Sequence, residues 1–259
     1  MKKYIQVALL STIISATGAN AAEKATNASD RYVYIGTEWG LSEPTVKSFK
    51  HKDSGTTIRL KQSHMYGGRI GYSFYPNMMV EFSVTHQPKY RLAYRLPEKA
   101  IAEIPGVSIP VTPGTTRVTA NVYMLNFIYE MQKMTSLQIK PYAIFGAGVA
   151  QISVKPTNSY WKLPAQIAGF FPQGELLFFK IKKTDTNCFA WQVGAGVSKD
   201  LTDNFSVDLG AKMQVVNDIK IKYDKLTNPI AQTYESQKPI KITIGVGEFT
   251  MGLTYKFPM

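Results

Sequence analysis

The chain has a single cysteine, Cys188, among its 259 residues, so an internal disulfide is excluded. It also lacks any stretch of about 20 apolar residues without charge, which excludes a transmembrane helix. Histidine is scarce, with three residues, and offers few candidates for a general base. Metal-ligand spacings, phosphate-binding glycine loops and cofactor motifs are missing too, so we expect neither a metal nor a cofactor.

Acidic residues are also few: 18 Asp and Glu stand against 30 Lys and Arg, which gives a formal net charge of +12. Such an excess of positive charge favours anionic partners, among them nucleic acid, lipid or lipopolysaccharide head groups, and sulfated sugars. The hydrophobic fraction of 44% would suit a soluble protein. It equally suits a membrane β-barrel, in which only alternate residues face lipid.

The N-terminal residues predict export. Met1–Lys3 is positively charged, Tyr4–Ile14 is mostly apolar but too short to span a bilayer as a helix, and Ala19–Ala21 supplies the small residues of a signal-peptidase site. We therefore predict a cleaved signal peptide over residues 1–21, followed by a short N-terminal segment over 22–31. Export argues against nucleic acid as a partner.

Alternation of apolar and polar side chains marks most of the remaining chain. Between Phe205 and Met213, for example, each apolar residue is followed by Ser, Asp, Gly or Lys. A period of two indicates β-strands with two different faces. We predict eight such strands, and most reach the roughly 9 to 11 residues that a tilted strand needs to cross a bilayer. They cover Tyr32–Gly40, His64–Tyr75, Met78–Lys89, Arg117–Met131, Lys140–Lys155, Asn187–Lys199, Asn204–Val216 and Gly245–Phe257.

The connections between these strands alternate in length. Long connections cover residues 41–63, 91–116, 156–186 and 218–244, and short, turn-like ones cover 76–77, 132–138 and 200–203. This alternation is typical of a barrel with tight periplasmic turns and long outer loops. We therefore predict an all-β fold, an eight-stranded antiparallel up-and-down transmembrane β-barrel with four long outer loops. It would occupy residues 32–259 and lie in the bacterial outer membrane.

The two faces of the predicted strands differ in polarity: one carries large apolar side chains, and the other carries ionised ones among Gly, Ser, Thr and Gln. A soluble lipocalin-like barrel would place the apolar side chains inside, so we expect lipid outside and a polar lumen inside. An interior of eight strands is just filled by side chains, so these charges should pair and block flow. A narrow channel or small-solute pathway is the alternative. The predicted lumen charge network comprises Glu38, Arg69, Glu81, Glu130, Asp208, Lys212, Glu248 and Lys256.

The long loops hold most of the positive charge, with 17 Lys and Arg against 9 Asp and Glu. We expect function to lie in loops presented by a rigid barrel. Their basic clusters would contact either lipopolysaccharide phosphates in the outer leaflet or acidic glycans and proteins on a host surface. The loop over 156–186 is unusually apolar, which indicates either an interaction site or a loop folded over the barrel mouth. The interaction candidates are Lys47, Lys50, Lys52, Trp161, Phe170, Phe171, Lys180, Lys182 and Lys183.

A lipid-modifying enzyme is a weaker alternative. Some eight-stranded outer-membrane barrels modify lipid A with His and Ser near the outer rim. Here Ser63 and His64 begin the second predicted strand, and His86 lies near the end of the third. No acidic partner is signalled beside either histidine, and a base needs a group that orients it. We therefore predict that the protein is not an enzyme.

Several glycine-containing segments carry a family resemblance. They are Lys140–Val149, Gln192–Val197 and Leu201–Gly210, and the signal peptide and the final Thr254–Phe257 fit the same layout. In these features the chain resembles the small outer-membrane β-barrel domain family that includes opacity-type proteins and rickettsial-type surface antigens. The resemblance implies surface roles such as adhesion to host cells. One departure is the ending: the family usually ends in an aromatic residue, whereas here Pro258 and Met259 follow Phe257.

Overall fold

The computed structural model describes most of the chain from Arg31 onward, and nearly all of it is β-strand. The described residues are 31–45, 48–50, 57–95, 114–132, 134, 138–162, 175–228 and 233–259. The predicted signal peptide and residues 22–30 lie outside them. Within the described ranges, no helix is long and apolar enough to cross a membrane.

Eight strands are long, with 13 to 19 residues each. They form because apolar side chains, many of them β-branched or aromatic, recur at alternate positions, which suits a pleated sheet with one apolar face. The eight are β1 (Tyr32–Pro44), β4 (Ser63–Tyr75), β5 (Met78–Arg95), β6 (Gly114–Glu130), β7 (Lys140–Val154), β10 (Thr184–Asp200), β11 (Phe205–Ile221) and β14 (Ile240–Pro258). Each overlaps one of the eight predicted strands.

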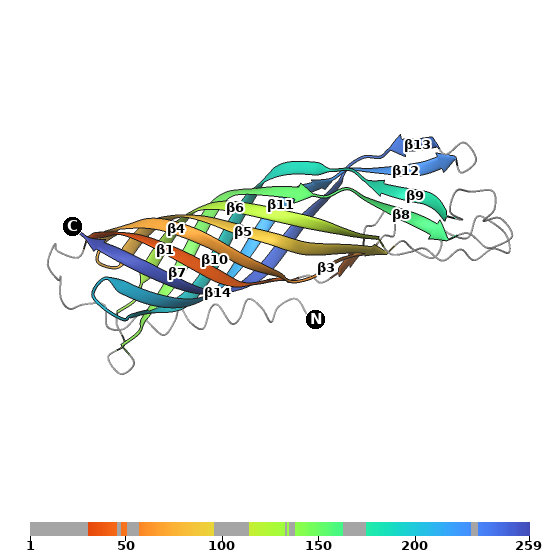
Figure 1. Ribbon diagram of the computed structural model, residues 1–259. Coiled ribbons are helices and arrows are strands. Elements are labelled where there is room, and N and C mark those ends of the chain that lie inside the picture. The colour runs from red at the N-terminus through yellow and green to blue at the C-terminus, as the bar shows by residue number, and fades with distance from the viewer. Residues whose placement is uncertain are drawn as a thin grey trace, which may run out of the picture. The chain divides into compact units, whose positions relative to one another are not determined.

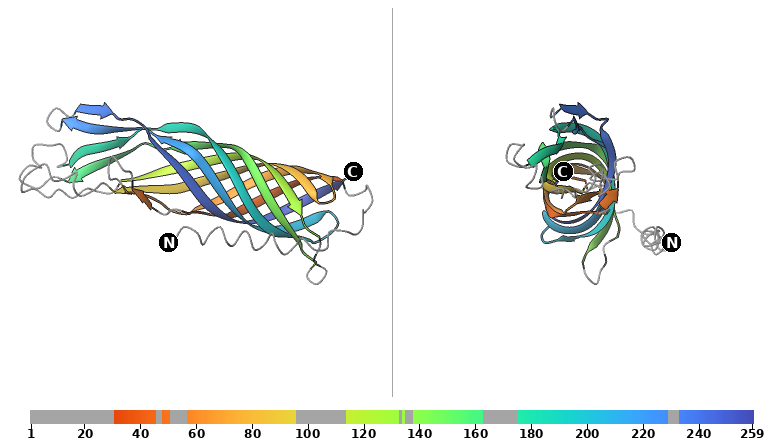
Figure 2. Two further views of the ribbon diagram at one scale, coloured as in Figure 1. Left: turned by 180° about the vertical axis from the view of Figure 1, so that it is seen from behind. Right: turned by 90° about the vertical axis from the view of Figure 1, so that its right-hand side faces the viewer.

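These strands close into a barrel. The order around it is β5-β4-β1-β14-β11-β10-β7-β6, every neighbouring pair is antiparallel, and β6 pairs back to β5 (Figures 1 and 2). Closure gives each strand two neighbours, so its backbone N–H and C=O groups find partners without water. The predicted eight-stranded antiparallel barrel is thus confirmed.

One end of the barrel carries both ends of the barrel chain and the short connections. Tyr32 of β1 pairs with Pro258 of β14, and the turn at Pro76–Asn77 and residues 201–204 join strands at the same end. Short connections mark the periplasmic end of an outer-membrane barrel. We call this end inner and the opposite end outer.

Shorter strands lie at the outer end, where loops were expected. β2 (Ser48–Lys50) and β3 (Thr57–Leu60) extend the barrel sheet beside β5. A second sheet, in the order β13-β12-β9-β8, lies beyond the barrel (Figure 1). Its strands are β8 (Thr157–Lys162), β9 (Glu175–Ile181), β12 (Tyr223–Asn228) and β13 (Thr233–Ser236). The predicted boundaries of the long connections were therefore too wide, because the strands run further outward than the sequence pattern indicated.

The outward face of the inner part of the barrel is apolar. Leu125 and Phe249, for example, have 60% and 66% of their surface exposed. Large exposed hydrophobic side chains that cover a continuous face indicate contact with lipid. The exposed apolar residues of this face include Ile35, Trp39, Leu41, Ile70, Phe82, Leu125, Phe127, Phe145, Phe189, Leu209, Met213, Phe249, Met251 and Leu253.

Along five neighbouring strands the lipid-facing surface ends at one row of residues. Tyr66, His86, Asn121, Gln151 and Asn187 stand directly opposite one another along β4, β5, β6, β7 and β10. All five are outward positions, and we call them the boundary row. Beyond it the outward positions are polar, with Arg117, Thr119, Ser153, Asp185, Lys220 and Lys241. The wall therefore changes at this row from a lipid-facing to a water-facing surface.

Candidate functional site

Charged side chains fill the inner half of the lumen. Lys212 Nζ of β11 lies 2.7 Å from Glu38 Oε2 of β1, and less than a tenth of either side chain is exposed. Arg69 of β4 donates two hydrogen bonds to the Asp208 carboxylate and one, 2.7 Å long, to Thr254 Oγ1. A guanidinium fork on a carboxylate is a strong and geometrically specific pair. Both ion pairs join strands that are not neighbours in the sheet.

A second group of polar side chains continues from Arg69. Its Nε atom lies 3.8 Å from Glu81 Oε2, which also accepts a 3.0 Å hydrogen bond from the Tyr34 hydroxyl. Asn126 Nδ2 donates to Glu81 Oε1 at 2.9 Å, and Gln192 Nε2 donates to Asn126 Oδ1 at 2.7 Å. The network therefore links β1, β4, β5, β6 and β10 across the lumen.

A third group lies at the inner mouth. Lys256 Nζ is 2.5 Å from Asp200 Oδ1, and Lys140 Nζ is 3.0 Å from Asp200 Oδ2. Glu130 is half-buried and lines the same cavity as Lys256. Sequence reasoning missed Asp200 and Lys140, because it assigned Asp200 to a turn and Lys140 to the start of a strand.

Two glycines make room for these side chains. The ring of Tyr34 lies over Gly71, in the space that a Cβ atom would occupy. A Cβ atom on Gly252 would come within 2.7 Å of Arg69 Nη2 and of the Asp208 carboxylate. Glycine inside a strand is expected where another group approaches the backbone closely. At these two positions it admits the large partners of the network.

The structure brings seven of the eight predicted lumen charges around one narrow cavity. These seven are Glu38, Arg69, Glu81, Glu130, Asp208, Lys212 and Lys256. The eighth, Glu248, lies on the inward face nearer the outer end, and Gln87 Nε2 donates to its Oε1 atom at 2.6 Å. Its Oε2 atom has no hydrogen-bond partner in the described part of the chain.

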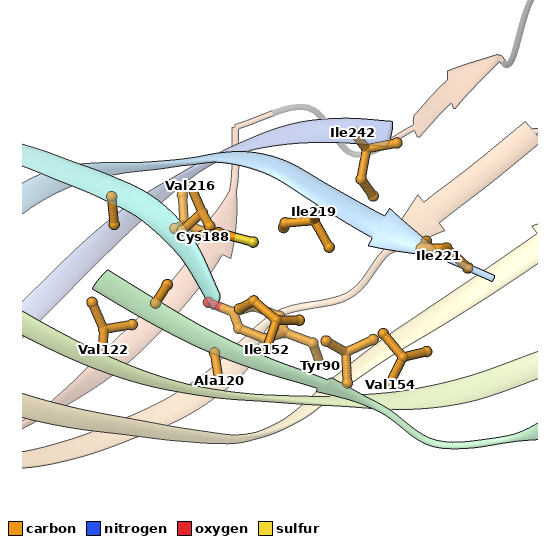
Figure 3. Packing of buried hydrophobic residues seen from close by; sticks show 14 of the residues in the cluster. Tyr90, Ala120, Val122, Ile152, Val154, Cys188, Val216, Ile219, Ile221 and Ile242 are labelled. Carbon is orange, nitrogen blue, oxygen red and sulfur yellow. The ribbon is translucent and has the colours of Figure 1, made fainter. Parts of the chain in front are cut away.

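The outer half of the lumen is apolar, so a polar lumen is found only in the inner half. Aliphatic side chains from β6, β7, β11 and β14 surround a small cavity, of about 40 Å³, that is partly open to solvent (Figure 3). We call this cavity the outer chamber. It is lined by Gln87, Tyr90, Val118, Ala120, Ile152, Val154, Gln214, Val216, Ile219, Ile221, Ile242, Ile244 and Val246.

The chamber is apolar because the polarity of the wall inverts at the boundary row. On β6, Arg117 and Thr119 point outward, whereas Val118 and Ala120 are buried inside. Water, rather than lipid, surrounds the wall at this level, so apolar side chains gain by turning inward, as in a soluble barrel. Side chains continue to alternate between the two faces of the strand without a break. Only the polar character of the outward residues shows that the wall has passed from lipid to water.

One side of the chamber wall lacks strand pairing. The β10–β11 ladder ends at Ala190 and Val216. Farther outward, residues 184–189 of β10 pair with β7 alone and residues 219–221 of β11 pair with β14 alone, although both segments are described. We call the unpaired stretch between them the lateral gap.

Both ends of the lateral gap are defined. A bulge at Asn217–Asp218, where Asp218 has a φ of 54°, opens it just beyond Val216. At its outer end the Lys182 N–H donates to the Lys222 carbonyl at 3.0 Å. The gap therefore runs beside the outer chamber and is bridged again where the second sheet begins.

The predicted interaction candidates are dispersed. Lys47, Lys52, Phe170 and Phe171 lie outside the described residues, and Lys50 and Trp161 lie in β2 and β8. Lys180 is exposed. Lys182 Nζ lies 2.8 Å from Asp224 Oδ1, and Lys183 Nζ lies 3.7 Å from Asp185 Oδ2.

The histidines near the outer rim meet neutral groups. His86 Nδ1 lies 2.5 Å from Asn121 Oδ1, and its ring centroid is 5.2 Å from that of Tyr66. His64 is exposed, and the Ser63 hydroxyl donates to the His64 carbonyl at 3.0 Å. These contacts place His86 in the polar and aromatic boundary row.

A lipid-facing wall, a closed eight-stranded sheet and an inner lumen filled by paired charges define a small outer-membrane β-barrel protein. The chain belongs to the family of the outer membrane protein beta-barrel domain, whose model matches residues 9–257. The protein is therefore one of the bacterial outer membrane.

The chain is also similar to individual proteins. The chain is 40% identical over 194 residues to the uncharacterized protein RP788 of Rickettsia prowazekii (strain Madrid E), a match that covers 75% of this chain and 99% of that protein. Among solved structures it is similar to OprG from Pseudomonas aeruginosa, at 15% identity and a TM-score of 0.48, over 88% of this chain and 96% of OprG. It is also similar to Neisserial surface protein A (NspA), at 16% identity and a TM-score of 0.38, over 90% and 100% of the two chains. These two likenesses concern the fold alone.

Proposed function

We propose that the protein binds polyanionic molecules through lysines on its water-facing wall and thereby acts in attachment to other surfaces. The observation that carries the proposal is a concentration of ammonium groups where the barrel meets the second sheet. These lysines, which we call the lysine belt, are Lys155, Lys182, Lys183, Lys220, Lys222 and Lys241.

The belt forms because three connections pass the same level of the wall. Lys155 follows β7, and Lys222 separates β11 from β12. Lys182 and Lys183 separate β9 from β10, which begins opposite the end of β7. The hydrogen bond between the backbones of Lys182 and Lys222 joins two of these connections. Lysines far apart in the sequence are thus neighbours on the wall.

Lys220 and Lys241 extend the belt along β11 and β14. They stand directly opposite each other, and both are exposed. The Cβ atoms of such a pair are about 4.5–5.5 Å apart, and like charges in this position destabilise a sheet. A bound sulfate or phosphate group would relieve the repulsion, so this pair is suited to an anionic ligand.

Acidic neighbours neutralise only part of the belt. Lys182 and Lys183 have the partners described above, whereas the other four belt lysines form no ion pair with any residue that the structure describes. A surplus of exposed ammonium groups attracts a polyanion, and salt screens that attraction.

The height of the belt favours a partner beyond the membrane. Lys155 follows Gln151 of the boundary row by four residues, which is about 13 Å along a strand. The phosphates of the outer leaflet lie at the membrane surface, close to the boundary row. Acidic glycans on a host surface are therefore the ligand class that we propose, and lipopolysaccharide phosphates are the alternative.

A narrow pathway for small solutes is a second candidate. Polar side chains line the inner cavity, which favours it, but ion pairs and hydrogen bonds join those side chains across the lumen. An eight-stranded interior is just filled by its own side chains. We therefore rank this candidate below surface binding.

A triple variant tests polyanion binding. Lys220→Gln/Lys222→Gln/Lys241→Gln removes three belt charges while it keeps long polar side chains. We expect its affinity for heparin, a sulfated glycan, to fall at least tenfold at physiological salt in nanodiscs that contain no lipopolysaccharide. Binding by the unmodified protein should weaken as salt rises.

Lys199→Gln is the matched control, because Lys199 is an exposed lysine at the inner end of the barrel. It should bind heparin as the unmodified protein does. If the control and the triple variant lose affinity for heparin equally, or if neither loses it, the lysine belt is not the binding site. Displacement of heparin by lipopolysaccharide at lower concentration would assign the belt to the cell's own membrane instead of a host glycan.

A further inference from the structure

The outer chamber has apolar walls and hydrogen-bond acceptors at its inner end. We propose that it binds a slender apolar molecule that ends in a hydrogen-bond donor, with an ammonium group preferred over a hydroxyl group. This site lies inside the barrel, whereas the lysine belt lies on the outer surface of the wall. The inference goes beyond the proposed function and does not rest on it.

Two buried acceptors have no donor, one of them in the chamber wall and the other just beneath the chamber. Gln214 lines the chamber, is 1% exposed, and its Oε1 atom has no hydrogen-bond partner among the described residues. Glu248 lies one inward position further in than Val246, is also 1% exposed, and its Oε2 atom has no partner in those ranges. Gln87 lines the chamber and donates a hydrogen bond to Glu248, so it connects the chamber to the carboxyl group beneath it. A buried acceptor left unpaired is costly, so a ligand that supplied a donor here would be held.

The charges beneath the chamber select the sign of the head group. The carboxylates of Glu38, Glu81, Asp208 and Glu248 face the cations of Arg69 and Lys212 in this part of the lumen. Four carboxyl groups therefore stand against two cations here, and electrostatic interactions in an interior with little water are stronger than in bulk solvent. A cationic head group is attracted to the inner end of the chamber, and an anionic one is repelled.

The walls select the shape of the rest of the molecule. Branched aliphatic side chains such as Val118, Ile152 and Ile219 face the cavity, so burial of an apolar chain against them is favourable. The interior of an eight-stranded barrel is only wide enough for side chains. A single linear chain fits such a space, whereas a fused ring system does not.

The lateral gap is the entry route that we propose for such a molecule, and one weak contact spans it, from Cys188 Sγ to the Asp218 carbonyl at 3.8 Å. Val216 and Ile219 lie at its β11 edge and also line the chamber. On the β10 edge the gap includes Asn187, a member of the boundary row, so it opens at the outer limit of the lipid-facing surface. A molecule dissolved in the outer leaflet would reach the chamber without passing the inner lumen.

Three probes with the same six-carbon chain test the site: hexylammonium, 1-hexanol and hexane-1-sulfonate. The full protein, in nanodiscs of zwitterionic lipid, carries ¹³C-labelled isoleucine methyl groups. Ile152, Ile219 and Ile242 report on the chamber, whereas Ile35 and Ile70 face lipid and report on probe dissolved in the bilayer. We expect saturable shifts of the chamber methyl groups with hexylammonium at concentrations at least tenfold lower than with the sulfonate, with hexanol between them.

Two variants separate the head group from the chain. Gln214→Leu removes an acceptor at nearly constant volume, so hexylammonium should bind at least fivefold more weakly and the difference between probes should narrow. Ala120→Leu fills the chamber and should abolish the saturable shifts. Ala211→Leu, at an exposed position on the lipid-facing side of β11, is its matched control and should change nothing. If Ala120→Leu does not fold, Gln214→Leu and the comparison of the three probes still test whether the chamber binds a cationic head group.

The proposal is overturned if the chamber methyl groups shift no more than those of Ile35 and Ile70. It is also overturned if the sulfonate saturates at the same concentration as hexylammonium, because the acceptors would then select nothing. The triple lysine variant should bind hexylammonium normally. Failure of heparin binding and failure of chamber binding are therefore distinguishable.

Discussion

At the scale of single residues, the inner lumen depends on charges that are buried with their partners. Lys212 and Glu38 are 174 positions apart in the sequence and meet only because the sheet closes. A buried ion pair adds little stability relative to an apolar pair of the same size, but a single buried charge without its partner is costly. The protein is therefore destabilised more by the loss of one residue of an ion pair than by the loss of both.

Replacing Lys212 by methionine isolates this effect. We expect Lys212→Met to lower the free energy of unfolding in lipid vesicles by about 3–5 kcal/mol, because it leaves the Glu38 carboxylate buried and unpaired. The double variant Glu38→Gln/Lys212→Met should lose less than the sum of the two single changes. Lys199→Met, at an exposed position, should stay within about 0.5 kcal/mol of the unmodified protein. A Lys212→Met protein as stable as that control would contradict the role of the pair.

The sequence placed the network residues on the correct face but did not pair them. Successive side chains of a strand point to opposite faces, so the alternation of apolar and polar residues shows which of them point inward. Pairing depends on strand order and on the stagger of a closed barrel, which bring Arg69 of one strand to Asp208 of another. Asp200 was missed for a different reason, because the sequence pattern placed it in a turn over 200–203, whereas it ends β10 and pairs with Lys140 and Lys256.

At the scale of strands, the sequence located the centres and misjudged the outer ends. The lipid-facing alternation defines a strand only as far as the boundary row. Beyond it, stretches such as Thr184–Thr186 and Ile219–Ile221 remain strand, with Thr184, Ile219 and Ile221 buried inside. Because the outward residues there are Lys, Asp and Asn, these stretches have the composition of loops. The same alternation of apolar and polar residues thus occurs in the lipid-facing and in the water-facing part of a strand.

The boundary row predicts how the two environments respond to the same substitution. Leu125 lies in the middle of the lipid-facing stretch of β6, and Thr119 lies on the same face beyond Asn121. We expect Leu125→Arg to cost about 2–4 kcal/mol of unfolding free energy in lipid vesicles, and Thr119→Arg about 0–1 kcal/mol, because the cost depends on depth in the bilayer. Urea titrations of the two variants would measure this difference. Equal costs would mean that both positions lie in the same medium.

At the scale of the whole molecule, the barrel has three levels along its axis. Paired charges line the inner lumen, the outer chamber is apolar, and the lysine belt and second sheet lie at the outer end. This order favours the proposed binding at the cell surface over transport inward, because the level of paired charges lies between the chamber and the periplasm.

Ion conductance tests the level of paired charges directly. We expect the unmodified protein in planar lipid bilayers to show no current steps above the noise, because its interior is filled and its charges are joined across the lumen. Arg69→Ala/Lys212→Ala removes both cations from the middle of the lumen and leaves carboxylates that repel one another and draw in water. This variant should show small steps that are selective for cations, whereas Lys199→Ala, at the outward face of the wall, should remain silent. Regular steps from the unmodified protein would show that the paired charges do not block the lumen, and the solute pathway would then rank above surface binding.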